Sequence, residues 1–197
     1  MNIQWYPGHM TKARRMMQEN IKLIDLVIEL VDARAPMSSR NPDIDDLAKG
    51  KARLILLNKS DLASERWNDA WAAAFKAQGF FVVKLDSRAR GGMKEVQAVI
   101  QEVCKEKTER DRRRGIINRP VRAMVVGIPN VGKSTFIKRF MDLMVLPNME
   151  DIHERERATD ELPQSAAGKT IMTTEPKFVP KEAVEIKVAG EISVKIR

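Results

Sequence analysis

One glycine-rich segment constrains the fold of this chain more strongly than any other feature. Residues 127–134 read Gly-Ile-Pro-Asn-Val-Gly-Lys-Ser and match G-x-x-x-x-G-K-[ST], a loop whose backbone N–H groups surround nucleotide phosphates. The run before it, 121–126, is short, apolar and typical of a strand, whereas residues 134–140 are typical of the start of a helix. The sequence therefore predicts a strand, a loop and a helix N-terminus, which together form an anion site.

The residue types in this loop suit phosphate binding. Gly127 and Gly132 lack a Cβ and permit a tight turn and close backbone approach. Lys133 would reach the β- and γ-phosphates, and the hydroxyl of Ser134 would bind Mg²⁺. A chance glycine-rich turn is the alternative, which the flanking strand and helix disfavour. The predicted phosphate-binding residues are Gly127, Asn130, Val131, Gly132, Lys133, Ser134 and Thr135.

A second motif, Asn58-Lys-Ser-Asp61, follows the apolar run 53–57 and matches N-K-x-D. A carboxylate at the end of a strand can accept two hydrogen bonds from N1–H and N2–H₂ of guanine. Adenine would leave Asp61 desolvated and unpaired, so guanine is the favoured base. Asp61 as a cap of the helix that begins near Ser64 is the alternative. The predicted guanine-binding residues are Asn58, Lys59, Ser60, Asp61, Asp86 and Ser87.

The hydrophobic pattern predicts an α/β fold, a three-layer P-loop NTPase-like domain with a mostly parallel sheet. Strands are expected at 24–31, 53–57, 80–83 and 121–126, and helices at 11–22, 43–49, 64–78, 93–106 and from 134. Thr11 is the expected N-cap of the first helix, and Trp67 and Trp71 are expected in the core. Residues 1–140 would form the nucleotide-binding core. Residues 141–197 would form a divergent or incomplete switch region, irregular over 141–176, and a β-rich tail with a hairpin at 183–188 and 191–196.

Composition narrows the class of protein and of partner. The 197 residues carry a net charge of +8, which favours a polyanionic partner such as nucleic acid. Lys12, Arg14 and Arg15 and the run 105–114 supply much of this charge, although the run could equally be a solvated helix end or linker. No apolar run reaches the ~18 residues of a membrane span. Cys104 is the only cysteine, which suits a reducing cytosol, and the N-terminus reads as mature protein rather than a transit peptide.

The order of the two nucleotide motifs is unusual. Asn58 precedes Gly127 by 69 positions, whereas in ordinary GTPases the phosphate loop comes first. A circular permutation keeps spatial contacts while it moves the termini. In this order the sequence resembles the circularly permuted GTPases of the YlqF/RbgA type over about residues 1–140. The resemblance rests on Trp5-Tyr-Pro-Gly-His-Met10, Asp32-Ala-Arg-Ala-Pro36 with Ser39-Arg-Asn41, Asn58-Lys-Ser-Asp61 and Gly127-Ile-Pro-Asn-Val-Gly-Lys-Ser134.

The resemblance implies a function. It implies a GTP-binding protein that hydrolyses GTP to GDP and phosphate during maturation of the large ribosomal subunit, with the particle as stimulator. GTP or GDP would be the ligand, and the large subunit or its rRNA the partner. Asn130 resembles the asparagine that holds K⁺ beside the phosphates in related GTPases. We expect a monomeric, cytoplasmic protein with Mg²⁺, and with K⁺ as a second ion.

The resemblance ends after Phe140. The family continues with a switch threonine, a strand that ends in Asp-Thr-Pro-Gly and a helical RNA-binding domain, but this sequence contains no D-x-P-G. Thr170, Thr173 and Thr174 are candidates for the switch threonine, and His9 for a catalytic or a structural role. The alternative function is a non-hydrolysing guanine-nucleotide-binding or RNA-binding module without a working switch. Divergence, truncation or a change at the gene level could each account for the tail.

Overall fold

The computed structural model describes residues 8–89, 92–116, 121–149, 151–162, 184–188 and 192–196. The candidate switch threonines Thr170, Thr173 and Thr174 lie outside the described residues, and the side chain of His9 is not described. The α-helices are α1 (Gly8–Asn20), α2 (Asp43–Leu47), α3 (Glu65–Ala77), α4 (Met93–Arg113), α5 (Lys133–Phe140) and α6 (Ile152–Asp160). The strands are β1 (Leu26–Asp32), β2 (Ala52–Asn58), β3 (Phe81–Leu85), β4 (Ala123–Val126), β5 (Val184–Val188) and β6 (Ile192–Ile196).

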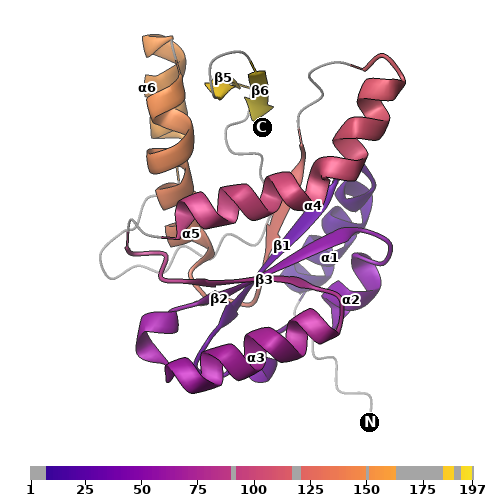
Figure 1. The fold of residues 1–197 in the computed structure, drawn as a ribbon, viewed down its shortest axis with the longest axis vertical. Coiled ribbons are helices and arrows are strands. Elements are labelled where there is room, and N and C mark those ends of the chain that lie inside the picture. The colour runs from indigo at the N-terminus through magenta and orange to yellow at the C-terminus, as the bar shows by residue number, and fades with distance from the viewer. Residues whose placement is uncertain are drawn as a thin grey trace.

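Four strands form one parallel sheet in the order β3-β2-β1-β4 (Figure 1). The register places the ends of β1, β2 and β3 level, because Asp32 is opposite Asn58 and Asn58 is opposite Leu85. Val126, the last residue of β4, is opposite Glu29, so the chain leaves β4 three residues before β1 ends. The loops that carry both nucleotide motifs therefore leave the same edge of the sheet, where ligands bind in open α/β folds.

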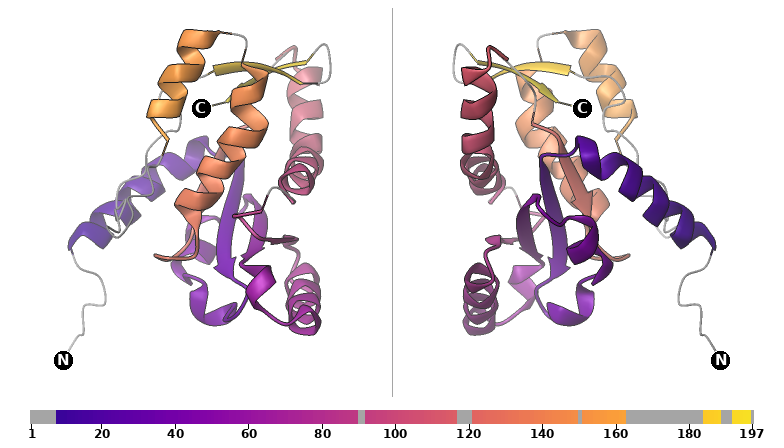
Figure 2. Two further views of the ribbon diagram at one scale, coloured as in Figure 1. Left: turned by 90° about the vertical axis from the view of Figure 1, so that its left-hand side faces the viewer. Right: turned by 90° about the vertical axis from the view of Figure 1, so that its right-hand side faces the viewer.

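Helices cover both faces of this sheet, so the predicted three-layer α/β fold is confirmed (Figure 2). Alternate residues of each strand point to opposite faces. One face packs Leu26, Leu54 and Leu56 against α4 and α5. The other face packs Ile55 and Leu57 against Phe75 of α3, and its β1–β4 part packs against α1 and α2.

A buried carboxylate lies on the central strand. Glu29 is 1% exposed, and both Arg40 and Arg53 bond to its carboxylate, at 3.1 and 2.6 Å. The two guanidinium groups also lie over the ring of Phe80, 5.2 and 4.8 Å from its centroid. A buried charge is tolerated when ion pairs and hydrogen bonds replace its hydration, and this network supplies both.

Two sequence predictions about the helices are wrong. Helix α1 begins at Gly8, so Thr11 lies inside the helix and is not its N-cap. Trp67 is 60% exposed, whereas Trp71 is half-buried and packs on Phe75 with ring centroids 5.8 Å apart. Helical spacing identified the apolar face correctly at Trp71 and Phe75, but Trp67 lies at the margin of that face, one turn before Trp71.

The segment after Phe140 was predicted to be irregular, which is wrong for residues 141–149 and 151–162. A π-helix (Met141–Val145) and a 3₁₀-helix (Leu146–Asn148) follow α5 directly, and α6 begins at Ile152. The side chain of Asp151 accepts hydrogen bonds from the N–H groups of His153 and Glu154 and caps α6. The buried residues Met141, Val145, Ala158 and Leu162 pack together against α5, because this segment carries its own apolar stripe.

The end of the described chain contains the predicted hairpin. β5 and β6 form a two-stranded antiparallel sheet in which Ile186 is opposite Val194. The charged run that begins at Lys105 forms the second half of α4, which continues to Arg113 rather than ending near Glu106. In the part of the chain that the structure describes, no helix is long and apolar enough to cross a membrane.

Candidate nucleotide-binding site

The predicted phosphate-binding loop connects β4 to α5 and has a strained, closely packed backbone. Gly127 and Gly132 have φ values of +149° and +99°, and Asn130 has φ of +65°. A Cβ on Gly127 would lie 2.7 Å from the carbonyl oxygen of Leu30, and one on Gly132 would overlap Nδ2 of Asn58. Both glycines are therefore needed because the loop passes close to the C-terminal ends of β1 and β2.

Lys133 is the first residue of α5, and its side chain turns back over the loop. Its Nζ donates to the carbonyl oxygens of Gly127 and Ile128, at 2.8 and 2.6 Å. Burial lowers the pKa of this ammonium. An anion bound at the loop would stabilise the charged form, so the ammonium is placed to gain from a phosphate group.

Ser134 and Thr135 occupy the first turn of α5, and both are half-buried. Among the described residues, no three His, Cys, Asp or Glu side chains gather as a metal site. Mg²⁺ usually takes one or two protein oxygens together with substrate phosphates. The Ser134 hydroxyl beside the phosphate loop fits such a partial site.

Asn58 connects the phosphate loop to the loop after β3. It is 2% exposed, and its Nδ2 donates to the carbonyl oxygen of Val131 at 2.7 Å. Its Oδ1 accepts from the backbone N–H and the hydroxyl of Ser87, at 3.0 and 2.7 Å. One amide side chain at the end of β2 therefore holds the phosphate loop on one side and the loop after β3 on the other.

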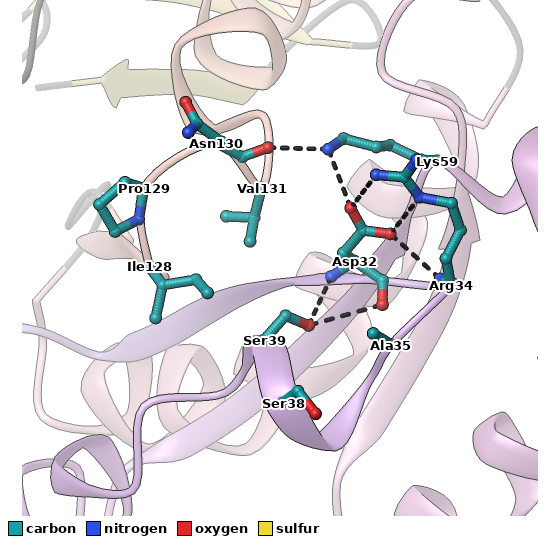
Figure 3. Close-up of a pocket in the computed structure, with 10 residues that line it drawn as sticks. All are labelled: Asp32, Arg34, Ala35, Ser38, Ser39, Lys59, Ile128, Pro129, Asn130 and Val131. Atoms are coloured by element: carbon teal, nitrogen blue, oxygen red, sulfur yellow. Dashed lines mark hydrogen bonds and ion pairs between the residues drawn. The ribbon is translucent and has the colours of Figure 1, made fainter.

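Lys59 forms a second bridge between the motifs, and its backbone adopts the left-handed conformation with φ of +60°. Its Nζ donates to Oδ2 of Asp32 at 2.9 Å and to the carbonyl oxygen of Asn130 at 2.8 Å (Figure 3). Arg34 forms two further hydrogen bonds to Asp32, at 2.9 and 2.8 Å. The Arg34 guanidinium, and then Lys59, hold the pKa of Asp32 far below its usual range against the opposing effect of burial.

A pocket of about 450 Å³ adjoins this bridge. Asp32, Arg34 and Ser39 line one wall, and Ile128 to Val131 of the phosphate loop line the other. Figure 3 shows the Asp32 carboxylate between Lys59 and Arg34, with Ser39 beneath it. The pocket therefore extends the candidate site from the phosphate loop to the loop after β1.

Asp61 lies in the 3₁₀-helix Ser60–Leu62, directly after Lys59. Its Oδ2 is 2.8 Å from an Nη of Arg88, whose own loop begins at Asp86. Asp86 is half-buried and accepts the backbone N–H of Arg88 at 2.9 Å. Ser60 accepts a hydrogen bond from Asn68 through its carbonyl oxygen, which fixes the start of α3 beneath the loop.

The structure thus gathers the two predicted residue sets at one edge of the sheet. Asn58 and Lys59 contact the phosphate loop directly, and Ser87 is linked to it through Asn58. Residues 32–36 were named as part of the family resemblance, but sequence reasoning did not assign Asp32 or Arg34 to the site. It also missed Arg88. The position of Arg88 shortly after the end of β3 was the feature of the sequence that could have indicated it.

We expect Asn58→Ala to lower the free energy of unfolding by about 3 kcal/mol, because Val131 and Ser87 would lose buried partners. Chemical denaturation would measure the change. Asn148→Ala is the control, since that amide is exposed and bonds only within its own helical segment, and it should cost less than about 0.5 kcal/mol. Equal effects of the two substitutions would show that Asn58 does not hold the loops together.

Comparisons with known proteins divide the chain into two overlapping similarities. Over 139 residues it is 52% identical to ribosome biogenesis GTPase A of Bacillus cereus, covering 71% of this chain and 47% of that protein. A GDP-bound structure of TM YlqF is 24% identical, covers 92% of this chain and 55% of that one, and has a TM-score of 0.50. The resemblance to the YlqF/RbgA type is confirmed, and the chain spans about half the length of the curated relatives it matches.

The second similarity concerns the C-terminal part. A family described as stage IV sporulation protein A, ATPase domain, matches residues 110–197. Stage IV sporulation protein A of Bacillus anthracis is 64% identical over 73 residues, covering 37% of this chain and 15% of that protein. The family match contains the predicted phosphate-binding loop at 127–134, so the departure after Phe140 is a similarity to a second kind of protein.

Proposed function

We propose, from the confirmed resemblance to YlqF/RbgA-type GTPases, that this chain binds GTP and GDP and hydrolyses GTP in assembly of the large ribosomal subunit. One observation carries the proposal. Asn58 and Lys59 of the N-K-x-D motif bond directly to the phosphate-binding loop at Val131 and Asn130. A base-reading loop and a phosphate-reading loop joined in this way form a single nucleotide site in a permuted chain.

Different residues of the site would bind different parts of the nucleotide. The N–H groups of the loop 127–134 and the N-terminus of α5 would hold the phosphates, with Lys133 on the β- and γ-oxygens. Asp61 would accept N1–H and N2–H₂ of guanine. Asn58 would keep the two loops in register, and Lys59 would lie along the base plane while it bonds to Asn130. Asp86 and Ser87 would close over the base.

Metal ions would act beside the phosphates. Ser134 would supply a hydroxyl ligand to Mg²⁺, which neutralises charge that develops on the phosphates. Asn130, which has a φ of +65° within the loop, would contribute to a K⁺ site, as its resemblance to the asparagine of related GTPases implies. Residues 1–140 would form the nucleotide-binding core and 141–197 the switch region and tail, with Thr170 and Thr173 as candidate switch residues and His9 as a further catalytic candidate.

The similarity to an ATPase domain supports a second candidate function, ATP binding. The matched region contains the phosphate loop and the residues C-terminal to it, while the N-K-x-D residues lie at 58–61, before the matched range. We therefore propose that the site binds guanine rather than adenine. A guanine-nucleotide-binding module that does not hydrolyse GTP is the remaining alternative, because Asp-x-x-Gly does not occur in the sequence.

Single-turnover hydrolysis separates a GTPase from a binding module. Radiolabelled GTP with excess protein, Mg²⁺ and K⁺ should yield GDP and phosphate, and the rate should rise when large ribosomal subunits are added. Retained GTP binding without release of phosphate under either condition would support the non-hydrolysing alternative instead.

The basic end of α4 is the proposed contact with rRNA. Arg110, Arg112, Arg113 and Arg114 are exposed and only Asp111 is buried, and this part of α4 extends beyond the sheet in Figure 1. Arg14 and Arg15 on α1 are also exposed. We expect sedimentation with large subunits to weaken steeply as salt rises, since each neutralised phosphate releases counterions.

Replacing Arg112, Arg113 and Arg114 with Gln should flatten the salt dependence, by about one unit of log–log slope for each arginine that contacts a phosphate. GTP affinity should stay unchanged. The control removes the same charge from exposed positions elsewhere, at Arg66, Lys76 and Lys94. Equal slopes for the two triple variants would mean that the end of α4 is a solvated helix end only.

A further inference from the structure

The carboxylate proposed to read guanine already has a partner in this structure. An Nη of Arg88 lies 2.8 Å from Oδ2 of Asp61, and the pair joins the loop after β3 to the loop after β2. The Asp61 side chain is 33% exposed and the Arg88 side chain 65%. The contact therefore lies at the mouth of the base site, where an incoming base and the arginine would meet the same oxygen.

Hydrogen bonds hold the backbone of Arg88 from two sides. Its N–H donates to Oδ1 of Asp86 at 2.9 Å, and its carbonyl oxygen accepts from Arg139 at 2.8 Å. Arg139 belongs to α5, the helix that starts at the phosphate loop. The position of Arg88 is thus coupled to the helix that would bind the phosphates.

A guanidinium group and the Watson–Crick edge of guanine offer the same chemistry to a carboxylate. Each presents neighbouring N–H donors in one plane, and a carboxylate accepts two parallel hydrogen bonds from such a group. Asp61 cannot hold both partners in that arrangement. We propose that Arg88 occupies the base-reading carboxylate in the nucleotide-free protein and is displaced when guanine binds. This inference rests on the assignment of Asp61 under the proposed function.

The need to displace Arg88 should lower the affinity for the nucleotide. Breaking an exposed ion pair weakens binding by up to about fivefold, the factor that corresponds to the upper range for such pairs. Every ligand that must displace Arg88 loses the same factor, so Arg88 lowers affinity without changing which base is preferred. Loss of a positive charge near an anionic ligand would by itself weaken binding, so the two effects have opposite signs.

Arg88→Gln therefore gives a clear test. We expect this variant to bind fluorescent GDP about two- to fivefold more tightly than the wild type, with faster association in stopped-flow mixing. The gain should be largest at low salt, because salt screens an exposed ion pair. ADP should remain a poor competitor, since Asp61 is unchanged. Arg66→Gln, the same substitution at an exposed position of α3, should bind GDP as the wild type does.

The outcomes separate this inference from the proposed function. If the wild type binds GDP but Arg88→Gln binds it equally well or more weakly, Arg88 is not a displaced occupant and the inference is overturned. If the wild type does not prefer GDP to ADP, the assignment of Asp61 fails, and the inference fails with it. Thermal melts of both variants would check folding, which we expect to be intact because both side chains are exposed.

Discussion

Lys133→Ala should weaken GTP and GDP binding by at least about 100-fold, because the charge-assisted bonds of one ammonium to two phosphate groups would be lost. The ammonium already lies over the loop, bonded to the carbonyl oxygens of Gly127 and Ile128. Truncation would leave those carbonyls to water at a cost of about 1 kcal/mol, so far-UV circular dichroism should not change. Isothermal titration with GDP would measure the affinity.

Lys138→Ala is the matched control for this substitution. Lys138 lies on the same helix, α5, but its side chain is exposed. It should bind GDP as the wild type does. If Lys133→Ala and Lys138→Ala bound GDP equally well, the loop at 127–134 would not be a phosphate site.

Ser134→Ala should lower GTP turnover or Mg²⁺-dependent binding, because it removes a proposed metal ligand.

Asp61→Asn should change the preferred base from guanine to xanthine. The carboxamide keeps one acceptor for N1–H but presents an NH₂ group to position 2, where guanine also has a donor and xanthine has an oxygen. GDP affinity should fall at least about 100-fold, since two charge-assisted bonds are lost and a donor meets a donor. Competition of GDP and XDP against a fluorescent guanine nucleotide would measure the exchange.

The control for the base is Asp69→Asn, the same chemical change on the exposed surface of α3, where Asp69 pairs with Lys84. It should retain the preference for GDP. Asp61→Asn variants that still preferred GDP over XDP would remove Asp61 from the base site. The alternative that Asp61 serves as a helix cap already lacks support, because α3 begins after Ser64 and Asp61 instead pairs with Arg88.

The sequence predicted the sheet well because its strands are nearly continuous apolar runs. Buried parallel strands have no polar face, so a short and continuous apolar run such as 53–57 is typical of a strand inside a parallel sheet. The two nucleotide motifs could be placed for a similar reason: each follows such a strand, and the carboxyl ends of parallel strands share one edge. Their contact through Asn58 and Val131 follows from that topology.

Ion pairs between residues far apart in the chain could not be predicted from the sequence. Glu29 breaks the apolar pattern of β1, and only the fold shows that Arg40 and Arg53 neutralise it. The same is true of the Asp32–Lys59 and Arg88–Asp61 ion pairs, because each joins two loops that are far apart in the chain. Helix α6 was missed because charged residues dominate its sequence, while the buried apolar residues of the segment after Phe140 pack together against α5.

Base preference is the central claim, because one part of the chain is similar to a GTPase and the other to an ATPase domain. The most direct test is equilibrium competition of unlabelled nucleotides against fluorescent GDP on the wild-type chain, with Mg²⁺ and K⁺ present. The site built from Asp61, Asn58 and the phosphate loop predicts that GDP and GTP displace the probe, and that ADP and ATP fail to do so at concentrations about 100-fold higher. Displacement by ATP at the same concentrations as GTP would contradict it.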